Sequence, residues 1–213
     1  KLGWLDKVVS GEPVLTHDIR RLTDAVAARY AGTRADVLRL AVPPRHATVE
    51  KRPAPPLEPL DPQPVDTAAW AAYQGGAQFV AALQEGRAAR AVWQALPGES
   101  WPQRLAEIAA ATVATGRGVL AVVPDQRDID QLQAAATVLL PDTRVVALSA
   151  GLGPAERYRR WLRALRGQAR LVIGTRSAAF APVSDLGLVL VWDDGDDSLA
   201  EPRAPYPHSP EGA

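Results

Sequence analysis

The sequence predicts an α/β protein built on a parallel sheet with helices on both faces. Short, continuously apolar strands alternate with helical segments over the later two-thirds of the chain, and strands that are apolar on both sides are typical of parallel sheets covered by helices. A small helical part precedes this region, and a proline-rich stretch separates the two. We therefore expect three segments: residues 1–47, 48–67 and 68–213.

The N-terminal part contains two expected helices. Thr16 is a suitable N-cap for the first helix, in which apolar residues recur at helical spacing: Ile19, Leu22, Val26 and Tyr30. A second short apolar helix covers residues 35–40. We expect residues 1–47 to be helical but loosely anchored, because they hold too few apolar side chains to bury a core of their own.

A proline-rich linker follows the two helices. Eight of the 22 residues from 43 to 64 are proline, which fixes φ, removes backbone donors and favours extended polyproline structure. We therefore predict that residues 48–67 connect the two parts without fixing their relative position.

The third segment alternates helices and strands. Helices are predicted at residues 105–115 and 126–140, and a further helix begins at Pro154, which favours a first helical turn. We expect residues 68–208 to form one lobe, with central strands at residues 119–123, 145–148, 171–173 and 188–192. In such a sheet a ligand site lies beyond the carboxyl ends of the strands.

Four carboxylates follow the last predicted strand. They are grouped around Gly195: Asp193, Asp194, Asp196 and Asp197. An apolar strand that ends in acids has the form of a Walker B motif, in which one Asp holds Mg²⁺ and the next acid orients the attacking water. An acidic turn that is exposed to solvent and closed by Gly195 is the alternative interpretation.

The preceding strand ends in a short polar segment: Gly174, Thr175, Arg176 and Ser177. A glycine lets the backbone approach a ligand, and a guanidinium with hydroxyl groups suits a phosphate, so this segment is a candidate contact with the DNA backbone. An ordinary turn with an exposed arginine is the alternative. The helix before this strand carries five arginines, which form either a nucleic-acid contact or only a solvated charged face: Arg157, Arg159, Arg160, Arg163 and Arg166.

Composition excludes several classes of site. The formal net charge is zero, so any contact with DNA must be local. The absence of cysteine excludes disulfides and thiolate zinc sites within these residues. The apolar runs are far shorter than the roughly 20 residues that cross a bilayer, so we expect a soluble, cytoplasmic protein without a membrane partner. The chain does not begin with Met and stops after a proline-rich tail, so both ends look cut.

One long stretch, "GLGPAERYRRWLRALRGQARLVIGTRSAAFAPVSDLGLVLVWDDGDD", resembles the first helicase lobe of the primosomal protein N′ (PriA) family. The family pattern runs from a "G-L-x-x-x-E-R" helix through "VIGTRSAxFxPxxxLG" to a "DEEH" box. Upstream, "EPVLTHDIRRLTDAVAARYAGTRADVLRLAVPP" is similar to the end of the family's N-terminal DNA-binding region. The resemblance covers most of residues 8–208. It implies a RecA-like lobe preceded by a small helical remnant of the DNA-binding region.

The nucleotide motifs of that family are degraded in this chain. Where the family has the phosphate loop "G-x-T-G-S-G-K-T", the sequence reads "ALPGESWP", with Trp101 at the lysine position and Pro102 at the threonine that would hold Mg²⁺. A phosphate loop works through backbone N–H groups, an ammonium and a hydroxyl. The candidate nucleotide-binding residues therefore belong to a degenerate loop: Gly98, Glu99, Ser100, Trp101 and Pro102. The acidic box is a degenerate Walker B motif: Asp193, Asp194 and Asp196.

These departures decide what the resemblance implies about function. In its compact form and its few helicase motifs, this chain is similar to family members of high-GC Gram-positive bacteria. Those members are regarded as lacking helicase activity. We therefore expect a DNA-binding primosome assembly protein acting at stalled replication forks, whose partners are forked DNA, primosome proteins and replicative helicase loading proteins. The alternative is an ATP-dependent 3′–5′ DNA helicase of superfamily 2. No cofactor is expected within these residues, and the family's zinc module is expected outside them.

Overall fold

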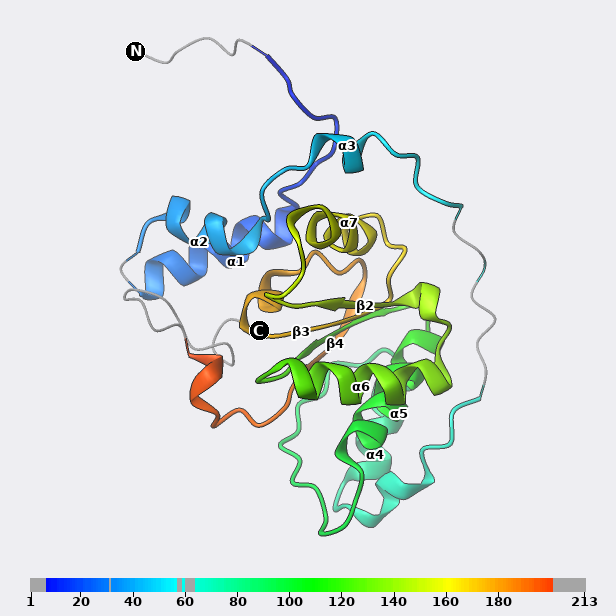
Figure 1. Ribbon diagram of the computed structural model, residues 1–213. Helices are drawn as coiled ribbons and strands as arrows, with labels where there is room; N and C mark the ends of the chain where they lie inside the picture. Colours follow the sequence, from blue (N-terminus) through cyan, green and yellow to red (C-terminus); the bar gives the residue numbers. More distant parts are fainter. Residues whose placement is uncertain (1–6, 31, 57–58, 60–63, 201–213) are drawn as a thin grey trace.

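Four parallel strands form the central sheet of the protein (Figure 1). The computed structural model describes residues 7–30, 32–56, 59 and 64–200. The strands are β1 (Gly118–Val122), β2 (Val145–Leu148), β3 (Leu171–Gly174) and β4 (Leu186–Val191), in the order β2-β3-β1-β4. Every neighbouring pair is parallel, which confirms the predicted sheet. Residues 201–208 of the expected lobe lie outside the described residues.

Helices surround the sheet, and several begin at caps that the sequence predicts. Thr16 accepts a hydrogen bond from the Ile19 N–H at the start of α1, and Asp125 accepts one from the Asp128 N–H at the start of α6. Pro154 occupies the first turn of α7. Among the described residues, no helix has both the length and the apolar composition needed to cross a membrane. The helices and 3₁₀ turns (η) are α1 (His17–Arg29), α2 (Arg34–Ala41), α3 (Ala47–Glu50), η1 (Ala68–Ala72), α4 (Gly76–Gln84), α5 (Trp101–Ala114), α6 (Gln126–Leu139), η2 (Asp142–Arg144), α7 (Pro154–Leu165), η3 (Arg176–Phe180) and η4 (Asp197–Leu199).

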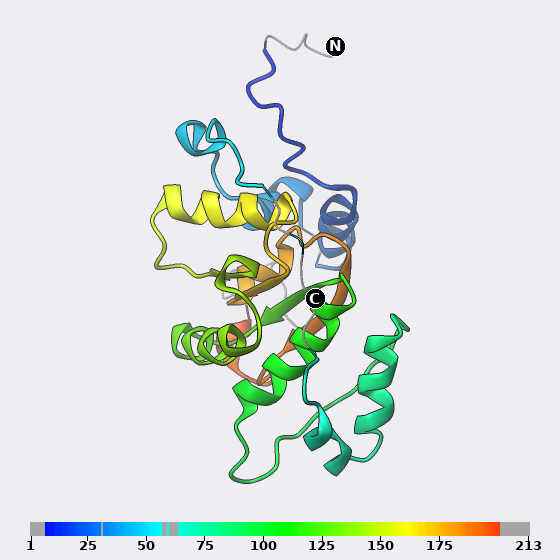
Figure 2. The same ribbon diagram turned by 90° about the vertical axis from the view of Figure 1, so that its right-hand side faces the viewer.

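One face of the sheet packs against α5 and α6. The strand residues on this face alternate along each strand, as the two-residue period of a strand requires. They are Val119, Ala121, Val123, Val145, Ala147, Leu171, Ile173, Leu188 and Leu190. Helix α4 packs mainly against α5 and forms an outer layer, which Figure 2 shows from the side.

The opposite face packs against α7, η3 and the two N-terminal helices. The intervening strand residues lie here: Leu120, Val122, Val146, Leu148 and Val172. They form one buried cluster with Ile19 and Val26 of α1 and Val37 of α2. Figure 1 shows α1 and α2 above the sheet beside α7. A parallel sheet with helices on both faces is the RecA-like arrangement that the resemblance implied.

The N-terminal segment is therefore part of the core, and the prediction that it is loosely anchored is wrong. Ile19 is 6% exposed and Val26 is 5% exposed, and Leu22 packs against the same cluster. The physical reason is that a parallel sheet must bury both faces, and α1 and α2 share the second face with α7. The spacing of apolar residues places them on one side of a helix, but it does not say which surface they meet.

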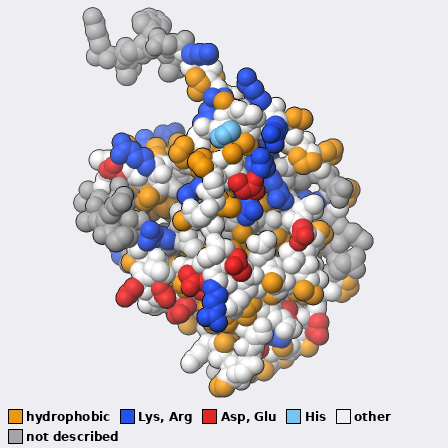
Figure 3. Space-filling view, viewed as in Figure 1, with side chains coloured by type: hydrophobic (Ala, Val, Ile, Leu, Met, Phe, Trp, Pro, Cys, Tyr) orange, Lys and Arg blue, Asp and Glu red, His pale blue; other side chains and the backbone are white. Residues whose placement is uncertain are grey.

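Charge is unevenly distributed over the surface. In Figure 3, Lys and Arg side chains gather in the upper half, over the N-terminal helices and α7, whereas Asp and Glu predominate below, most densely at the lower left. Within residues 7–52, nine cations are exposed: Lys7, Arg20, Arg21, Arg29, Arg34, Arg39, Arg45, Lys51 and Arg52. The net charge of zero thus combines a basic side with an acidic side.

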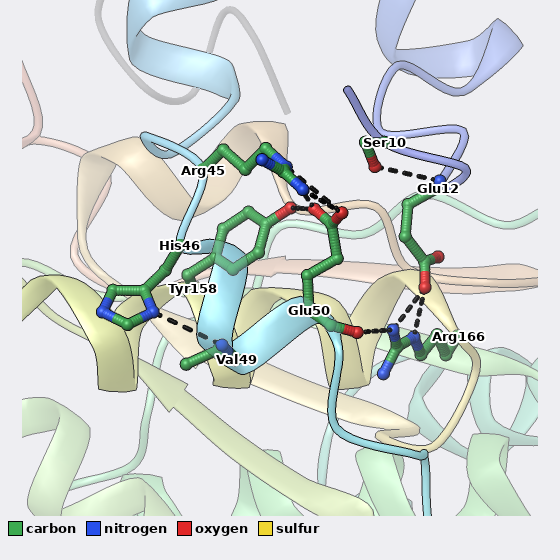
Figure 4. Close-up of polar contacts among 8 residues, drawn as sticks. All are labelled: Ser10, Glu12, Arg45, His46, Val49, Glu50, Tyr158 and Arg166. Atoms are coloured by element: carbon green, nitrogen blue, oxygen red, sulfur yellow. Dashed lines mark hydrogen bonds and ion pairs between the residues drawn. The ribbon is translucent and has the colours of Figure 1, made fainter. Parts of the chain in front are cut away.

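A network of polar and charged side chains holds α3 and the segment around Glu12 against α7 (Figure 4). The Glu50 carboxylate accepts hydrogen bonds from the Arg45 guanidinium, the shortest at 2.8 Å, and from the Tyr158 hydroxyl at 2.7 Å. Arg166 donates to the carboxylate of Glu12 and to the carbonyl of Glu50. The segment predicted to be an extended linker therefore begins with an anchored helix. The domain boundary placed at residue 47 stays a prediction.

This network sets the ionisation of two of its members. Hydrogen bonds from Arg45 and then Tyr158 lower the pKa of Glu50 to about 2. Burial and the hydrogen bond to Glu50 raise the pKa of Tyr158 to about 12. Near neutral pH, Glu50 is therefore an ionised acceptor and Tyr158 is a neutral donor.

Replacing Ile19 by Ala should destabilise the whole lobe. The substitution leaves a cavity between α1 and the sheet, and truncation of a buried Ile to Ala typically lowers stability by about 2–5 kcal/mol. We expect the free energy of unfolding to fall by this amount in a single transition, measured by urea denaturation followed by circular dichroism and tryptophan fluorescence. Val138→Ala on the exposed side of α6 should change it by less than about 0.5 kcal/mol. A separate, earlier transition for the N-terminal helices would contradict the shared core.

Glu50→Gln should remove part of the acid sensitivity of the fold. A carboxylate whose pKa is lowered on folding from 4.5 to about 2 stabilises the folded state above pH 4.5, and this contribution is lost as the pH falls from 4.5 to about 2. In urea titrations at about pH 7, 4 and 3, the wild type should therefore lose more stability than Glu50→Gln does. Glu85→Gln, which removes an exposed carboxylate, should lose as much stability on acidification as the wild type does. If Glu50→Gln also loses as much stability as the wild type, the network does not anchor α3.

Candidate functional site

The carboxyl ends of β1, β3 and β4 lie next to one another at one edge of the sheet, as the parallel arrangement requires. Residues 175–177 leave the end of β3, and residues 192–197 leave the end of β4. Beyond them, the Ser198 hydroxyl donates to the Pro124 carbonyl after β1 at 3.2 Å. The structure therefore brings the acidic segment and the segment after β3 to the same edge.

The acidic residues after β4 form a turn that is exposed to solvent. Asp193, Asp194 and Asp197 are exposed, and Asp193 adopts a left-handed backbone with φ of 49°, which Asp tolerates better than most residues. Asp196 accepts the Ser198 N–H at 2.7 Å, and hydrogen bonds from Ser198 lower the pKa of Asp196. Within the described ranges, no group of three or more His, Asp or Glu side chains is arranged to hold a metal ion. The arrangement matches the acidic-turn interpretation.

The neighbouring end of β1 is acidic as well. Asp125 caps α6 and Asp128 lies in the first turn of that helix. Burial raises the pKa of Asp128, and the negative charges of Asp125 and Asp193 raise it further. Carboxylates thus gather where β1 and β4 end.

Gly174 and Arg176 have structural partners. A Cβ added to Gly174 would lie 2.5 Å from both the Ala178 Cβ and the Leu148 carbonyl oxygen. Packing therefore requires glycine here, and the approach of a ligand to Gly174 stays a prediction. Arg176 donates to the Ala200 carbonyl at 2.6 Å, so its guanidinium ties the turn after β4 to the end of β3.

The two hydroxyl residues of this segment are half-buried. The Ser177 hydroxyl accepts a hydrogen bond from the Arg157 guanidinium at 3.4 Å. The Thr175 carbonyl accepts the Ala178 N–H at 2.7 Å and closes the 3₁₀ turn η3. The segment is therefore integrated into the fold through α7 as well as through the turn after β4.

The arginines of α7 are engaged within the protein. Arg160 pairs with Glu156 at 2.9 Å and donates to the Ala147 carbonyl of β2 at 2.9 Å. Arg163 donates to the Thr143 carbonyl at 2.6 Å, and burial, followed by the charge of Arg160, lowers its pKa. These contacts fasten α7 to the sheet, so this helix is more than a solvated charged face.

The degenerate phosphate loop leads into α5. Gly98 has a φ of 78°, and α5 begins at Trp101 with Pro102 in its first turn. Ser100 is the N-cap residue, but its side chain makes no capping hydrogen bond. The first N–H groups of the helix and its dipole therefore favour an anion at this end.

The carboxylate of Glu99 lies at this helix start. One of its oxygens is 3.1 Å from the Arg104 Nε. The other accepts the Leu96 N–H at 3.3 Å and also the Tyr73 hydroxyl. Arg104 pairs in addition with Glu107 at 2.6 Å. An internal carboxylate therefore already pairs with Arg104, a cation in the first turn of α5.

Aromatic rings fill the space between this loop and the end of β4. Trp101, at the position of the family's lysine, stacks on Trp192 with ring centroids 4.4 Å apart and an interplanar angle of 8°. Trp93 contacts Trp192 at 5.8 Å, and Trp70 and Tyr73 extend the aromatic cluster. Each such pair stabilises the fold by about 0.5–1.5 kcal/mol beyond the area it buries. Sequence comparison with the family pattern singled out Trp101 but none of its partners.

Known proteins match the chain over its full length, although no family model matches it. It is 71% identical over 214 residues, all of this chain, to the "Probable replication restart protein PriA" of Mycobacterium tuberculosis strain CDC 1551. It is 66% identical over 217 residues to the protein of the same name from Mycobacterium leprae. The "Replication restart protein PriA" of Bacillus subtilis is 34% identical over 71 residues, which are 33% of this chain and 9% of that protein.

The chain spans about a third of the length of the mycobacterial relatives. The mycobacterial relatives cover it from end to end, and the strongest part of the resemblance to the family pattern, at residues 172–187, lies in β3, η3 and the start of β4. This chain therefore belongs to the replication restart protein PriA family.

Proposed function

We propose that this chain is a segment of a protein that binds forked DNA at stalled replication forks and assembles primosome and helicase-loading proteins there, without acting as a helicase. The names of the mycobacterial relatives support the role in replication restart. Because the chain spans about a third of those relatives, the activity and the partners are proposed for the longer protein. The proposal places that protein in the cytoplasm and its zinc module outside these residues, which contain no cysteine.

The observation that carries the proposal is the filled nucleotide loop. A triphosphate at the start of α5 would have to displace the Glu99 carboxylate from Arg104 and to disturb the stacked rings beside it. In return, the triphosphate would gain neither an ammonium group nor a hydroxyl group that holds a metal. Trp101 stands at the position of the family's lysine, and Pro102 stands at the position of its threonine. Phosphoryl transfer depends almost wholly on such positioning and charge neutralisation, so this loop is poorly suited to ATP.

The distribution of charge supports contact with DNA on the basic side. Arg20 and Arg21 of α1 are exposed, as are Lys51 and Arg52 after α3, and Figure 3 shows Lys and Arg gathered over this region. Exposed cations bind backbone phosphates without reading the bases. Contact of this kind suits a protein that recognises the structure of a fork and not its sequence.

The longer protein should show no ATP hydrolysis stimulated by DNA. We expect turnover at background level in steady-state assays with saturating forked DNA, both for the parent and for a variant in which Asp193 and Asp194 are changed to Ala, because no triphosphate is positioned beside these acids. Turnover in the parent that disappears in the double variant would restore the helicase alternative. Fork binding by both proteins, measured in the same samples, shows that each protein is folded and able to bind DNA.

Arg176→Ala in the longer protein tests the proposed DNA contact of the segment after β3, residues 174–177. Affinity should fall alike for forks of unrelated sequence, and the slope of log affinity against log salt should decrease by about one, measured by fluorescence anisotropy. Ser198→Ala is the matched control, because it removes the hydrogen bond to Pro124 that holds the same turn without removing a charge. An unchanged salt slope for Arg176→Ala, or an equal loss in Ser198→Ala, would argue against a phosphate contact.

A further inference from the structure

A pocket lies at the amino edge of the sheet, opposite the edge that carries the acidic turn. It is bounded by η2, which leads into β2, by the end of α7 with the loop before β3, and by the proline-rich segment. Its volume of about 340 Å³ is within the range of small-ligand sites, roughly 300–1,000 Å³. We call this hollow the amino-edge pocket.

The amino-edge pocket has an exposed rim and a polar floor. The rim residues Pro55, Pro56 and Asp142 are exposed to solvent. On the floor, Arg144 is 7% exposed and Gln168 is 8% exposed. Electrostatic interactions with groups on such a floor are less screened by water than interactions at the rim. The pocket therefore offers its cationic and amide donors at its most buried part.

Arg163 is a cation of this pocket without an anionic partner. Its half-buried guanidinium donates to the Thr143 carbonyl at 2.6 Å, and it forms no ion pair with a carboxylate of the described residues. Glu156 of the same helix pairs instead with Arg159 and Arg160. Burial, followed by the charge of Arg160, lowers the pKa of Arg163. A half-buried cation in this situation is a candidate binding group for an anion.

Hydrogen bonds within the protein hold the pocket in shape. The Gln168 amide donates to the Pro55 carbonyl at 2.9 Å, which fixes the proline-rich segment against the loop before β3. The Arg170 N–H donates to the Arg144 carbonyl at 2.8 Å and joins η2 to the start of β3. The proline rings restrict φ, so Pro55 and Pro56 form a rigid apolar wall. A preformed site loses less conformational freedom when it binds a ligand.

This combination of groups fits a phosphate that is attached to an organic group. Guanidinium and amide N–H groups are suitable donors to phosphate oxygens, and the proline wall adds apolar contact for the rest of the ligand. Asp142 carries the opposing charge. Because its carboxylate lies on the exposed rim, water and salt screen its repulsion of an anion.

The amino-edge pocket adjoins the basic side of the protein. Lys51 and Arg52 are exposed and precede Pro55 by only a few residues along the chain. Figure 3 shows Lys and Arg gathered over the N-terminal helices and α7, the helix whose last turn contains Arg163. A DNA strand that binds to this side would bring its phosphates close to the pocket.

We propose that the amino-edge pocket binds the phosphate group of a nucleotide, with Arg163 as the charged donor and the Gln168 amide as a second donor. The nucleotide is either a unit of a bound DNA strand or a free mononucleotide. The first source rests on the proposed function and deepens it, whereas the second is independent of it.

Titration of the longer protein with thymidine 5′-monophosphate tests the pocket without DNA. Arg163→Gln removes the charge and keeps a donor for the Thr143 carbonyl. Affinity, measured from the line width of the ³¹P NMR signal, should fall about 10- to 100-fold, as expected for the loss of a hydrogen bond between charged groups. Arg87→Gln is the matched control, because it removes an exposed guanidinium outside the pocket, and its affinity should equal that of the wild type.

Asp142→Asn provides a second variant with the opposite expected effect. The side chain is exposed, so the substitution should leave the Tm unchanged. Loss of the rim carboxylate should strengthen mononucleotide binding by about two- to five-fold. Unchanged affinity in a folded Arg163→Gln variant overturns the proposal. If Arg163→Gln does not fold, unchanged affinity in Asp142→Asn overturns it.

Titration with forked DNA, followed by fluorescence anisotropy over a range of salt concentrations, identifies the source of the phosphate. Weaker fork binding by Arg163→Gln, with a salt slope smaller by about one, assigns the pocket to a DNA strand. Loss of mononucleotide binding alone assigns it to a free nucleotide. A wild type that binds the mononucleotide but no forks contradicts the proposed function and leaves the pocket assignment intact. If forks bind and neither ligand responds to Arg163→Gln, only the pocket assignment fails.

Discussion

The burial of both faces of one small parallel sheet is the constraint on which the rest of the structure depends. Alternate residues of each strand point to opposite sides, so two separate apolar surfaces need cover. Helices α5 and α6 cover one surface, and α7 covers the other together with α1 and α2. Detachment of the N-terminal helices would open the buried cluster that they share with the sheet and with η3, against which α2 packs. Apolar burial already favours this placement of the N-terminal part, and the contacts of Glu50 and Arg166 secure it further.

The same sheet creates the edge at which a nucleotide would bind, and the protein's own side chains occupy that place. Glu99 supplies an anion at the start of α5, Arg104 balances its charge, and the aromatic cluster supplies the packing. Each contact is modest alone, but together they turn a ligand site into packed structure. A lobe with these contacts, and without the lysine and threonine of the family's phosphate loop, agrees with the proposed role in assembly.

Much of the fold was predictable because it rests on local patterns. Thr16, Asp125 and Pro154 mark helix starts through capping and backbone preference, and the continuous apolar runs mark the strands within one or two residues. The polar segments at the strand ends were predictable from the residues themselves, whereas Trp101 was identified only by the family pattern. Its partners Trp93 and Trp192 lie far apart in the sequence, and no local pattern joins them.

By itself, the sequence determined the α/β class and the parallel strands, because both follow from residue type and spacing along the chain. The resemblance to the family pattern identified the loss of the phosphate-binding residues. Only the tertiary structure decided that the N-terminal helices complete the core, that Gly174 is required by packing against Leu148, and that Glu99 meets Arg104 beside stacked indole rings. These outcomes depend on which surfaces meet in space. Apolar burial is not directional, so a helix with an apolar face packs against whichever apolar surface the rest of the fold leaves open.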